Sequence, residues 1–132
     1  DGAAIDALVA SARAMSSPLS QVLLRHMGGA TARVAPEATA FRFRGAEHIL
    51  TIAAAWSPSD DSADLHRQWC RDTWTALRPA SAGGAYVNQL DGEGEDRTRE
   101  AYGEATWQRL VQAKRRYDPH NLFRMNQNIR PD

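Results

Sequence analysis

The sequence predicts an α+β fold in which an antiparallel sheet of about four strands is covered by helices. Three segments carry apolar residues at helical spacing, and four short runs are rich in β-branched, aliphatic or aromatic residues. Helices interspersed with a few antiparallel strands build a layer of helices over a sheet. At 132 residues, the chain is long enough for one domain with a modest core, or for part of a larger domain.

The first helix is predicted over residues 2–15, where apolar side chains recur at positions i, i+3, i+4 and i+7. This apolar stripe consists of Ile5, Leu8, Val9 and Ala12. The helix should end at the segment SSP, and the apolar run QVLLRH at residues 21–26 predicts the first strand.

Two further strands are expected at residues 39–44 (TAFRFR) and 48–56 (HILTIAAAW). In the first, phenylalanines alternate with arginines, which is typical of a strand with two different faces. The second is apolar nearly throughout, which predicts a central strand covered on both faces. The segment GAE at residues 45–47 is then expected to be the turn of a hairpin that joins them.

The second helix is predicted over residues 57–79, with Ser57 or Ser59 as its cap and Pro79 as its end. Its expected apolar stripe is Leu65, Trp69, Thr73 and Leu77. A last strand follows at residues 83–90 (GGAYVNQL), and a last helix at residues 106–117. One side of that helix carries Trp107, Leu110, Val111 and Lys114.

The last helix should end before Pro119, because proline lacks a backbone N–H and pushes Asp118 out of the α region. Asn121 suits the turn that follows. Leu122 and Phe123 are apolar, so we expect the tail to pack against another part of the protein.

Composition excludes several classes of function. Sixteen basic residues balance sixteen acidic ones, so no net charge favours nucleic acid or an anionic membrane as a partner. No apolar run approaches a membrane span and the first residues show no secretory pattern, so we expect a soluble protein. The single cysteine, Cys70, excludes an internal disulfide framework and favours the cytoplasm as the compartment, with secretion of a longer parent left open.

The histidines do not predict a metal site, because they are scattered and lack the paired spacing of a metal-binding helix. They are His26, His48, His66 and His120. The chain starts at Asp1 without an initiator methionine, from which we expect a processed or truncated product.

Two segments near the end of the chain carry a family resemblance. The tail follows the pattern Y-D-P-x-N-x-F-x-x-x-Q-x-I, and a Tyr-x-Asn motif lies upstream at Tyr86 and Asn88. The matching tail residues are Tyr117, Asp118, Pro119, Asn121, Phe123, Gln127 and Ile129. In these features the chain resembles the C-terminal region of FAD-linked oxidoreductases of the berberine bridge enzyme type, with the berberine-like tail at about residues 84–130.

The resemblance implies that residues 1–132 are the C-terminal substrate-domain portion of a larger oxidase. In such a protein an FAD-binding domain, expected outside this chain, holds most of the FAD, so the chain alone should neither retain FAD nor catalyse a reaction. The parent would oxidise an alcohol, an amine or a similar C–H centre by hydride transfer to the flavin, with O2 as the acceptor. Its partners would be that FAD-binding domain and a small-molecule substrate, and an exposed sheet face could also support a homo-oligomer.

The resemblance also implies roles for individual residues. Tyr86 would be the catalytic base, and Asn88, two residues further on the same strand face, would orient the substrate or the flavin ring. Thr51 and Gln89 are expected near the substrate, although family members often carry a second tyrosine at the position of Gln89 and, in some, a carboxylate or amide at that of Thr51. The remaining cofactor contacts would be Asn121 and Gln127.

Structural roles remain open for the same residues. Tyr86 could be a half-buried strand tyrosine, and the amides of Asn121 and Gln127 could satisfy the backbone of an irregular tail. The whole chain could likewise be a free-standing α+β module that binds a ligand or dimerises. A piece of a larger protein should differ from such a module by exposing an apolar sheet face or tail.

Overall fold

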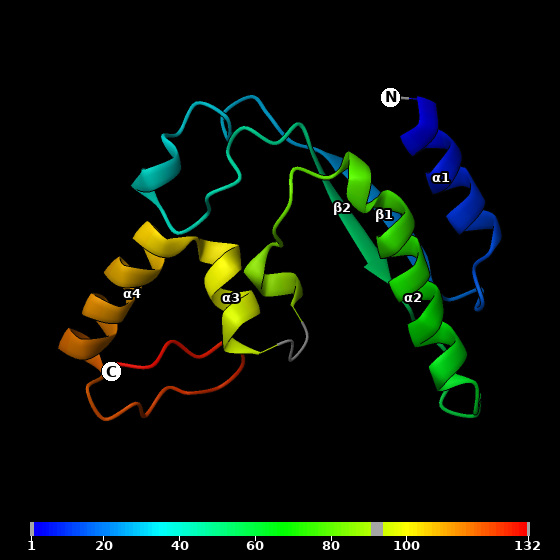
Figure 1. The fold of residues 1–132 in the computed structure, drawn as a ribbon. Helices are drawn as coiled ribbons and strands as arrows, with labels where there is room; N and C mark the ends of the chain where they lie inside the picture. The colour runs from blue at the N-terminus through cyan, green and yellow to red at the C-terminus, as the bar shows by residue number, and fades with distance from the viewer. Residues whose placement is uncertain (1, 91–93, 132) are drawn as a thin grey trace. The chain divides into compact units, whose positions relative to one another are not determined.

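The structure, a computed structural model, describes residues 2–90 and 94–131. Its four α-helices and two β-strands, counted over that part of the chain, confirm an α+β fold (Figure 1). The chain forms two compact units. The first consists of Asp1–Met27 and Glu47–Gly83, and the second of Gly28–Ala46 and Gly84–Asp132.

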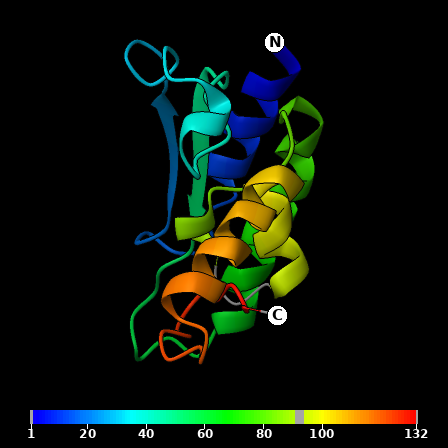
Figure 2. The ribbon, with the colours of Figure 1, turned by 90° about the vertical axis from the view of Figure 1, so that its left-hand side faces the viewer.

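The first unit is a two-stranded antiparallel sheet with two helices. Strand β1 (Gln21–His26) pairs with β2 (His48–Ala53) in a register that runs from Gln21 opposite Ala53 to His26 opposite His48. Helices α1 (Gly2–Arg13) and α2 (Ala63–Leu77) contact each other and lie on one side of the strands (Figure 2).

Helix α2 supplies most of the core of this unit, but its buried stripe differs by one position from the predicted one. The buried residues are His66, Trp69, Thr73 and Leu77. Leu65 is 59% exposed, and His66 occupies the place that we expected for it. The reason is a polar one, since both ring nitrogens of His66 and the indole N–H of Trp69 find hydrogen-bond partners inside the unit.

Helix α1 also turns a different face inward. Ile5 and Val9 of the predicted stripe are exposed, whereas Ser11 is buried. The carbonyl of Ser11 accepts a hydrogen bond from Trp69 Nε1 at 3.0 Å. A small side chain at this position lets the backbone of α1 approach the large indole of α2, and this contact outweighs the apolar periodicity.

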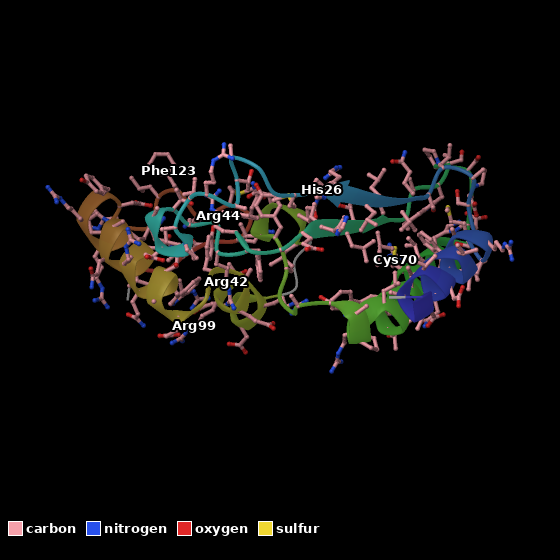
Figure 3. All side chains as sticks on the ribbon, turned by 90° about the horizontal axis from the view of Figure 1, so that it is seen from above. His26, Arg42, Arg44, Cys70, Arg99 and Phe123 are labelled. Carbon is pink, nitrogen blue, oxygen red and sulfur yellow. The ribbon has the colours of Figure 1, made fainter. Side chains whose placement is uncertain are left out.

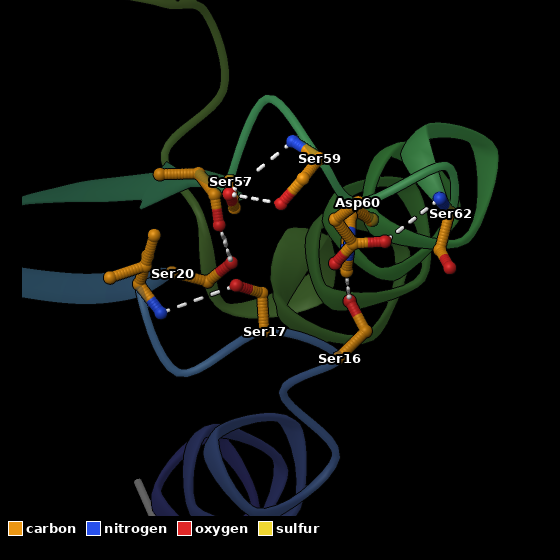
Figure 4. Close-up of polar contacts among 10 residues, drawn as sticks. Ser16, Ser17, Ser20, Ser57, Ser59, Asp60 and Ser62 are labelled. Atoms are coloured by element: carbon orange, nitrogen blue, oxygen red, sulfur yellow. Dashed lines mark hydrogen bonds and ion pairs between the residues drawn. The ribbon is translucent and has the colours of Figure 1, made fainter.

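Helix α2 begins at Ala63, later than predicted, because serine side chains hold the preceding residues in turns. The Ser57 and Ser59 hydroxyls lie 2.9 Å apart, and the backbone N–H of Ser59 donates to Ser57 Oγ (Figure 4). Ser62 N–H donates to Asp60 Oδ1 at 2.9 Å. Such local bonds from side chain to backbone compete with helix formation.

The predicted strands at residues 39–44 and 83–90 are wrong, and so is the hairpin turn at 45–47. Both segments are irregular apart from a 3-10 helix at Val87–Gln89, and β2 pairs with β1 instead. With one neighbour, β2 is not a central strand. The phenylalanines that suggested a strand pack against other residues of their unit instead. A Cβ atom on Gly84 would lie 2.4 Å from the Phe43 ring, so glycine is required at position 84.

The second unit contains helices α3 (Glu95–Tyr102) and α4 (Glu104–Tyr117). The predicted helix at 106–117 is confirmed as part of α4, with Trp107 and Val111 buried. Helix α3 was not predicted, because its sequence EDRTREAY is mostly charged and its buried residues, Thr98 and Ala101, are small. Gly103, with φ +75°, separates the two helices.

Among the described residues, no helix combines the length and the apolar character that a transmembrane span needs.

The position of the α2 stripe can be tested by truncating two side chains of that helix. Trp69→Ala should lower the free energy of unfolding by about 3–5 kcal/mol, because it removes a buried indole and leaves Ser11 O without its donor. Leu65→Ala, the matched control, should change it by less than about 0.5 kcal/mol. Urea unfolding followed by circular dichroism measures both, and a larger effect at Leu65 would contradict the observed stripe.

The junction of α3 and α4 has a pH dependence of its own. Arg99 donates through Nε and Nη2 to the two Glu104 oxygens, each at 2.7 Å. These bonds, together with a smaller effect of the hydrogen bond from Gln108, lower the pKa of Glu104 to about 2. The depressed pKa makes the pair stabilising above pH 4.5, the ordinary value, and this contribution is lost as the pH falls toward 2.

A carbon-13 NMR titration of the Glu104 carboxylate should therefore show its midpoint near 2, and Arg99→Gln should return the midpoint toward 4.5. Because both side chains are partly exposed, added salt should weaken the effect. An unchanged midpoint in Arg99→Gln would show that another group sets the Glu104 pKa.

Candidate functional site

Tyr86 and Asn88 lie together in the second unit. The 3-10 helix Val87–Gln89 brings their side chains side by side, and Asn88 Nδ2 donates a hydrogen bond to the Tyr86 hydroxyl at 2.8 Å. Gln89 N–H donates to the Tyr86 carbonyl at 2.8 Å and closes the turn. We predicted that a strand would bring Tyr86 and Asn88 together, but a 3-10 turn does so.

Aromatic and basic residues of segment 39–46 hold Tyr86 in place. The rings of Phe41 and Tyr86 meet edge to face, with 5.5 Å between centroids and 86° between planes. The Arg44 guanidinium lies 5.1 Å from the centre of the Phe41 ring. Tyr86 is half-buried and Asn88 is exposed, so the pair lies at the surface of its unit rather than in the core.

A second phenol, Tyr102, interacts electrostatically with Tyr86. Burial raises the pKa of Tyr102, and the electrostatic interaction with Tyr86 raises it further. Tyr102 therefore stays protonated at neutral pH and can donate a hydrogen bond. Sequence reasoning missed this residue, because it lies at the end of a helix that the apolar pattern did not reveal.

The start of the tail is fixed by Asp118, the C-cap of α4, which confirms the predicted helix end. Its carboxylate accepts hydrogen bonds from the backbone N–H groups of Leu122 (2.8 Å) and Phe123 (3.0 Å), and it pairs with Lys114. The bond from Lys114 contributes most to the lowered pKa of Asp118, and the two backbone bonds add to it. Asp118, the middle residue of the Tyr-Asp-Pro stretch, therefore anchors the backbone of the tail.

Beyond this anchor, the structure places the two predicted tail amides differently. Gln127 Nε2 donates to the carbonyl of Leu90 and so ties the tail to the segment that follows the Tyr86 turn. Asn121 has φ 52° and lines a surface cavity of about 630 Å³. The side-chain oxygens of Asn121 and Asn128, both in the wall of this cavity, are buried and have no hydrogen-bond partner among the described residues.

Of the other predicted site residues, Gln89 lies in the same unit as Tyr86 and Asn88, and Thr51 does not. Thr51 lies in β2 of the first unit, opposite Leu23, whereas Tyr86 belongs to the second unit. Gln89 is exposed next to Asn88. The roles assigned to the predicted residues therefore stay predictions.

The first unit holds a hydrogen-bonded row of Ser16, His66 and Asp60 that the sequence did not reveal. Figure 4 labels its two ends, Ser16 and Asp60. His66 Nε2 donates to Asp60 Oδ2 at 3.0 Å, and in the neutral ring Nδ1 accepts from Ser16 Oγ at 2.7 Å. Although hydrolases use the same three residue types, this imidazole is 1% exposed and stacks on Trp56, so a substrate has no route to it. We assign the row a structural role.

Comparison with known proteins adds family information. A family model described as "Berberine and berberine like" matches residues 85–130. The chain is 36% identical over 111 residues to an FAD-linked oxidoreductase of Dictyostelium discoideum, covering 83% of this chain and 24% of that protein.

Two further relatives agree with this. The chain is 38% identical over 106 residues to the uncharacterized FAD-linked oxidoreductase YgaK of Bacillus subtilis, covering 80% of this chain and 23% of that protein. It is 31% identical over 136 residues to the berberine bridge enzyme-like C-1 protein of Nicotiana tabacum, covering 79% of this chain and 24% of that protein. The chain thus spans about a quarter of the length of these curated relatives.

The anchoring role of Asp118 can be tested by replacing it with asparagine. Asp118→Asn removes the charge that pairs with Lys114 and one of the two oxygens that accept from the tail, so the amides of Leu122 and Phe123 should exchange hydrogen faster. Hydrogen exchange followed by NMR measures this. Asp64→Asn, the same change at an exposed helical aspartate, should leave these amides unaffected.

Acidification gives a second measure of the anchor. Because its pKa is lowered, Asp118 stabilises the tail above its ordinary pKa, and this contribution is lost as the pH falls through the lower folded value. Tail amides that stay protected in Asp118→Asn would contradict the anchor.

Proposed function

Because residues 85–130 belong to the berberine and berberine-like family, we propose that this chain is the C-terminal substrate-binding part of an FAD-dependent oxidoreductase. The relatives named FAD-linked oxidoreductases, and the quarter of their length that the chain spans, support this proposal. The FAD is held mainly by an FAD-binding domain of the same parent chain, outside these residues. The chain alone is inactive and does not retain FAD.

The proposed contact between the tail and a flavin ring is based on two amide oxygens. An isoalloxazine presents an N–H donor beside carbonyl acceptors, and Asn121 and Asn128 each offer a buried oxygen without a donor among the described residues. Asn121 would accept from the ring, and Asn88 would contact the ring or the substrate. Gln127 would support them by holding the tail to Leu90.

The proposed chemistry assigns each side chain a task in the removal of two hydrogens from an alcohol, an amine or a similar C–H centre. The flavin, when bound, accepts the hydride from the substrate carbon, and O2 is the proposed final acceptor. As its phenolate, Tyr86 takes the proton from the neighbouring O–H or N–H and becomes the neutral phenol. Asn88 fixes the Tyr86 oxygen by its hydrogen bond, and a second lone pair of that oxygen remains for the substrate proton.

Two further residues of the second unit belong to the proposed site. Tyr102, whose pKa is raised by burial and by its electrostatic interaction with Tyr86, would donate a hydrogen bond to the substrate. Gln89 would contact the substrate and help to set its identity, and the substrate contact predicted for Thr51 stays a separate proposal.

The exposed tail supports the proposed FAD-binding partner. Leu122, Phe123 and Met125 are 76%, 82% and 84% exposed, although we expected the first two to be buried. Figure 3 shows Phe123. Exposed patches of large apolar side chains mark interaction sites, so a surface of the parent's FAD-binding domain would cover these three. Leu24 of β1 is also exposed, and the proposed homo-oligomer would use this face of the sheet instead.

The single observation that carries the proposal is the hydrogen-bonded Tyr86–Asn88 pair inside the segment that matches the family. The test uses the complete product of the gene that encodes these residues. It should purify with flavin absorbance, and a screen of alcohols and amines should find compounds that bleach the flavin without oxygen. Tyr86→Phe should keep the flavin and lose most of the bleaching rate, because the phenol that takes the proton is gone.

The control is Tyr117→Phe, which removes a hydroxyl from an exposed tyrosine and should leave the bleaching rate unchanged. Asn121→Ala should weaken flavin retention, because it removes the acceptor. A colourless full-length product would favour the alternative, a free-standing ligand-binding or dimerisation module. A normal bleaching rate in Tyr86→Phe would rule out Tyr86 as the base.

A further inference from the structure

His26 and His48, which are distant in sequence, form the last residue pair of the β1–β2 ladder. His26 lies directly opposite His48 in the register, and their ring centroids are 5.3 Å apart with 66° between the planes. The next pair along, Met27 and Glu47, is joined by a backbone hydrogen bond of 2.7 Å. Hydrogen-bonded and non-hydrogen-bonded pairs alternate in an antiparallel ladder, so the histidines occupy the kind of pair in which side chains lie closer.

The surroundings of the pair suit a cation. Both histidines are exposed, and His26 lies at the end of β1 (Figure 3). Side chains alternate along a strand, so Arg25 points to the opposite face of the sheet and its charge does not adjoin the imidazoles. The nearest residues on the histidine face are Leu24 and its partner Leu50, which are uncharged and offer no competing hydrogen bond.

We propose that His26 and His48 together bind one transition-metal ion of the kind that prefers imidazole, namely Zn²⁺, Cu²⁺ or Ni²⁺. Neutral imidazole nitrogens are ligands for all three ions. The described residues contain no group of three or more histidine, cysteine or acidic side chains that could hold a metal. The two imidazoles are therefore the protein ligands, and water completes the coordination.

The place of the pair in the chain gives the ion a structural effect. The chain leaves the first unit after Met27 and returns to it at Glu47. A metal ion on His26 and His48 would join the two strands at the point where the chain departs and returns. Since the ion binds the paired strands better than separated ones, it should stabilise the ladder by mass action.

The test titrates Cu²⁺ into the untagged, metal-free chain. We expect one saturable equivalent, with electron paramagnetic resonance showing hyperfine coupling to two imidazole nitrogens, and a rise in the unfolding temperature with added Cu²⁺. His26→Ala and His48→Ala should each lose the two-nitrogen signal and the thermal shift. The control, His120→Ala, removes another exposed histidine and should keep both.

Two results would overturn the proposal: the same two-nitrogen signal in the double variant His26→Ala/His48→Ala, or its loss in His120→Ala. Should an alanine variant unfold, His26→Gln and His48→Gln replace it, with the amide spectrum of β1 and β2 as the check on folding. Flavin content plays no part in these measurements, so their outcome is independent of the proposed oxidoreductase function.

Discussion

The carboxylate of Asp118 is the constraint on which the C-terminal part of the second unit depends. It lies at the end of α4, where proline prevents the helix from continuing, and it accepts from the next free backbone N–H groups. Lys114, one turn earlier, neutralises the buried charge and also donates to the carbonyl of Phe123. The tail is thus folded back at its first residues by one side chain, and the conformation of Asn121 follows from that turn.

In the first unit, hydrogen bonding rather than apolar content decides which helix faces are buried. His66 and the Trp69 indole can be enclosed because Ser16, Asp60 and the Ser11 carbonyl satisfy them. Leu65 and Ile5 remain outside, although transfer to an apolar environment would favour them. Enclosing a polar group without a partner costs free energy, so the burial of a helix is set by the face on which partners exist.

This explains what the sequence could and could not predict. Helix α4 was predictable because Trp107 and Val111 follow helical spacing and are buried accordingly, and its end was predictable from Pro119. The irregular conformation of residues 39–44 was not predictable, because alternating Phe41 and Phe43 fit a strand and a cluster of aromatic rings equally well. Only the close approach of the Phe43 ring to Gly84 distinguishes the two. The proximity of Tyr86 and Asn88 was expected because a strand and a 3-10 turn can both bring residues two positions apart together.

The Ser16–His66–Asp60 row could not be predicted. Ser16 and His66 are 50 positions apart in the sequence, His66 and Asp60 are 6 apart, and no local pattern reveals such contacts.

The same anchor links the fold of the tail to its exposure. Side-chain and backbone hydrogen bonds satisfy the polar groups at the start of the tail, whereas the apolar side chains of Leu122, Phe123 and Met125 remain in solvent. A segment held by polar bonds keeps its shape without burying its apolar groups, so its conformation does not depend on a partner. This is the arrangement that a preformed docking surface requires, because little conformational entropy is lost when a partner covers it. The buried acceptor oxygens of Asn121 and Asn128 belong to that same segment.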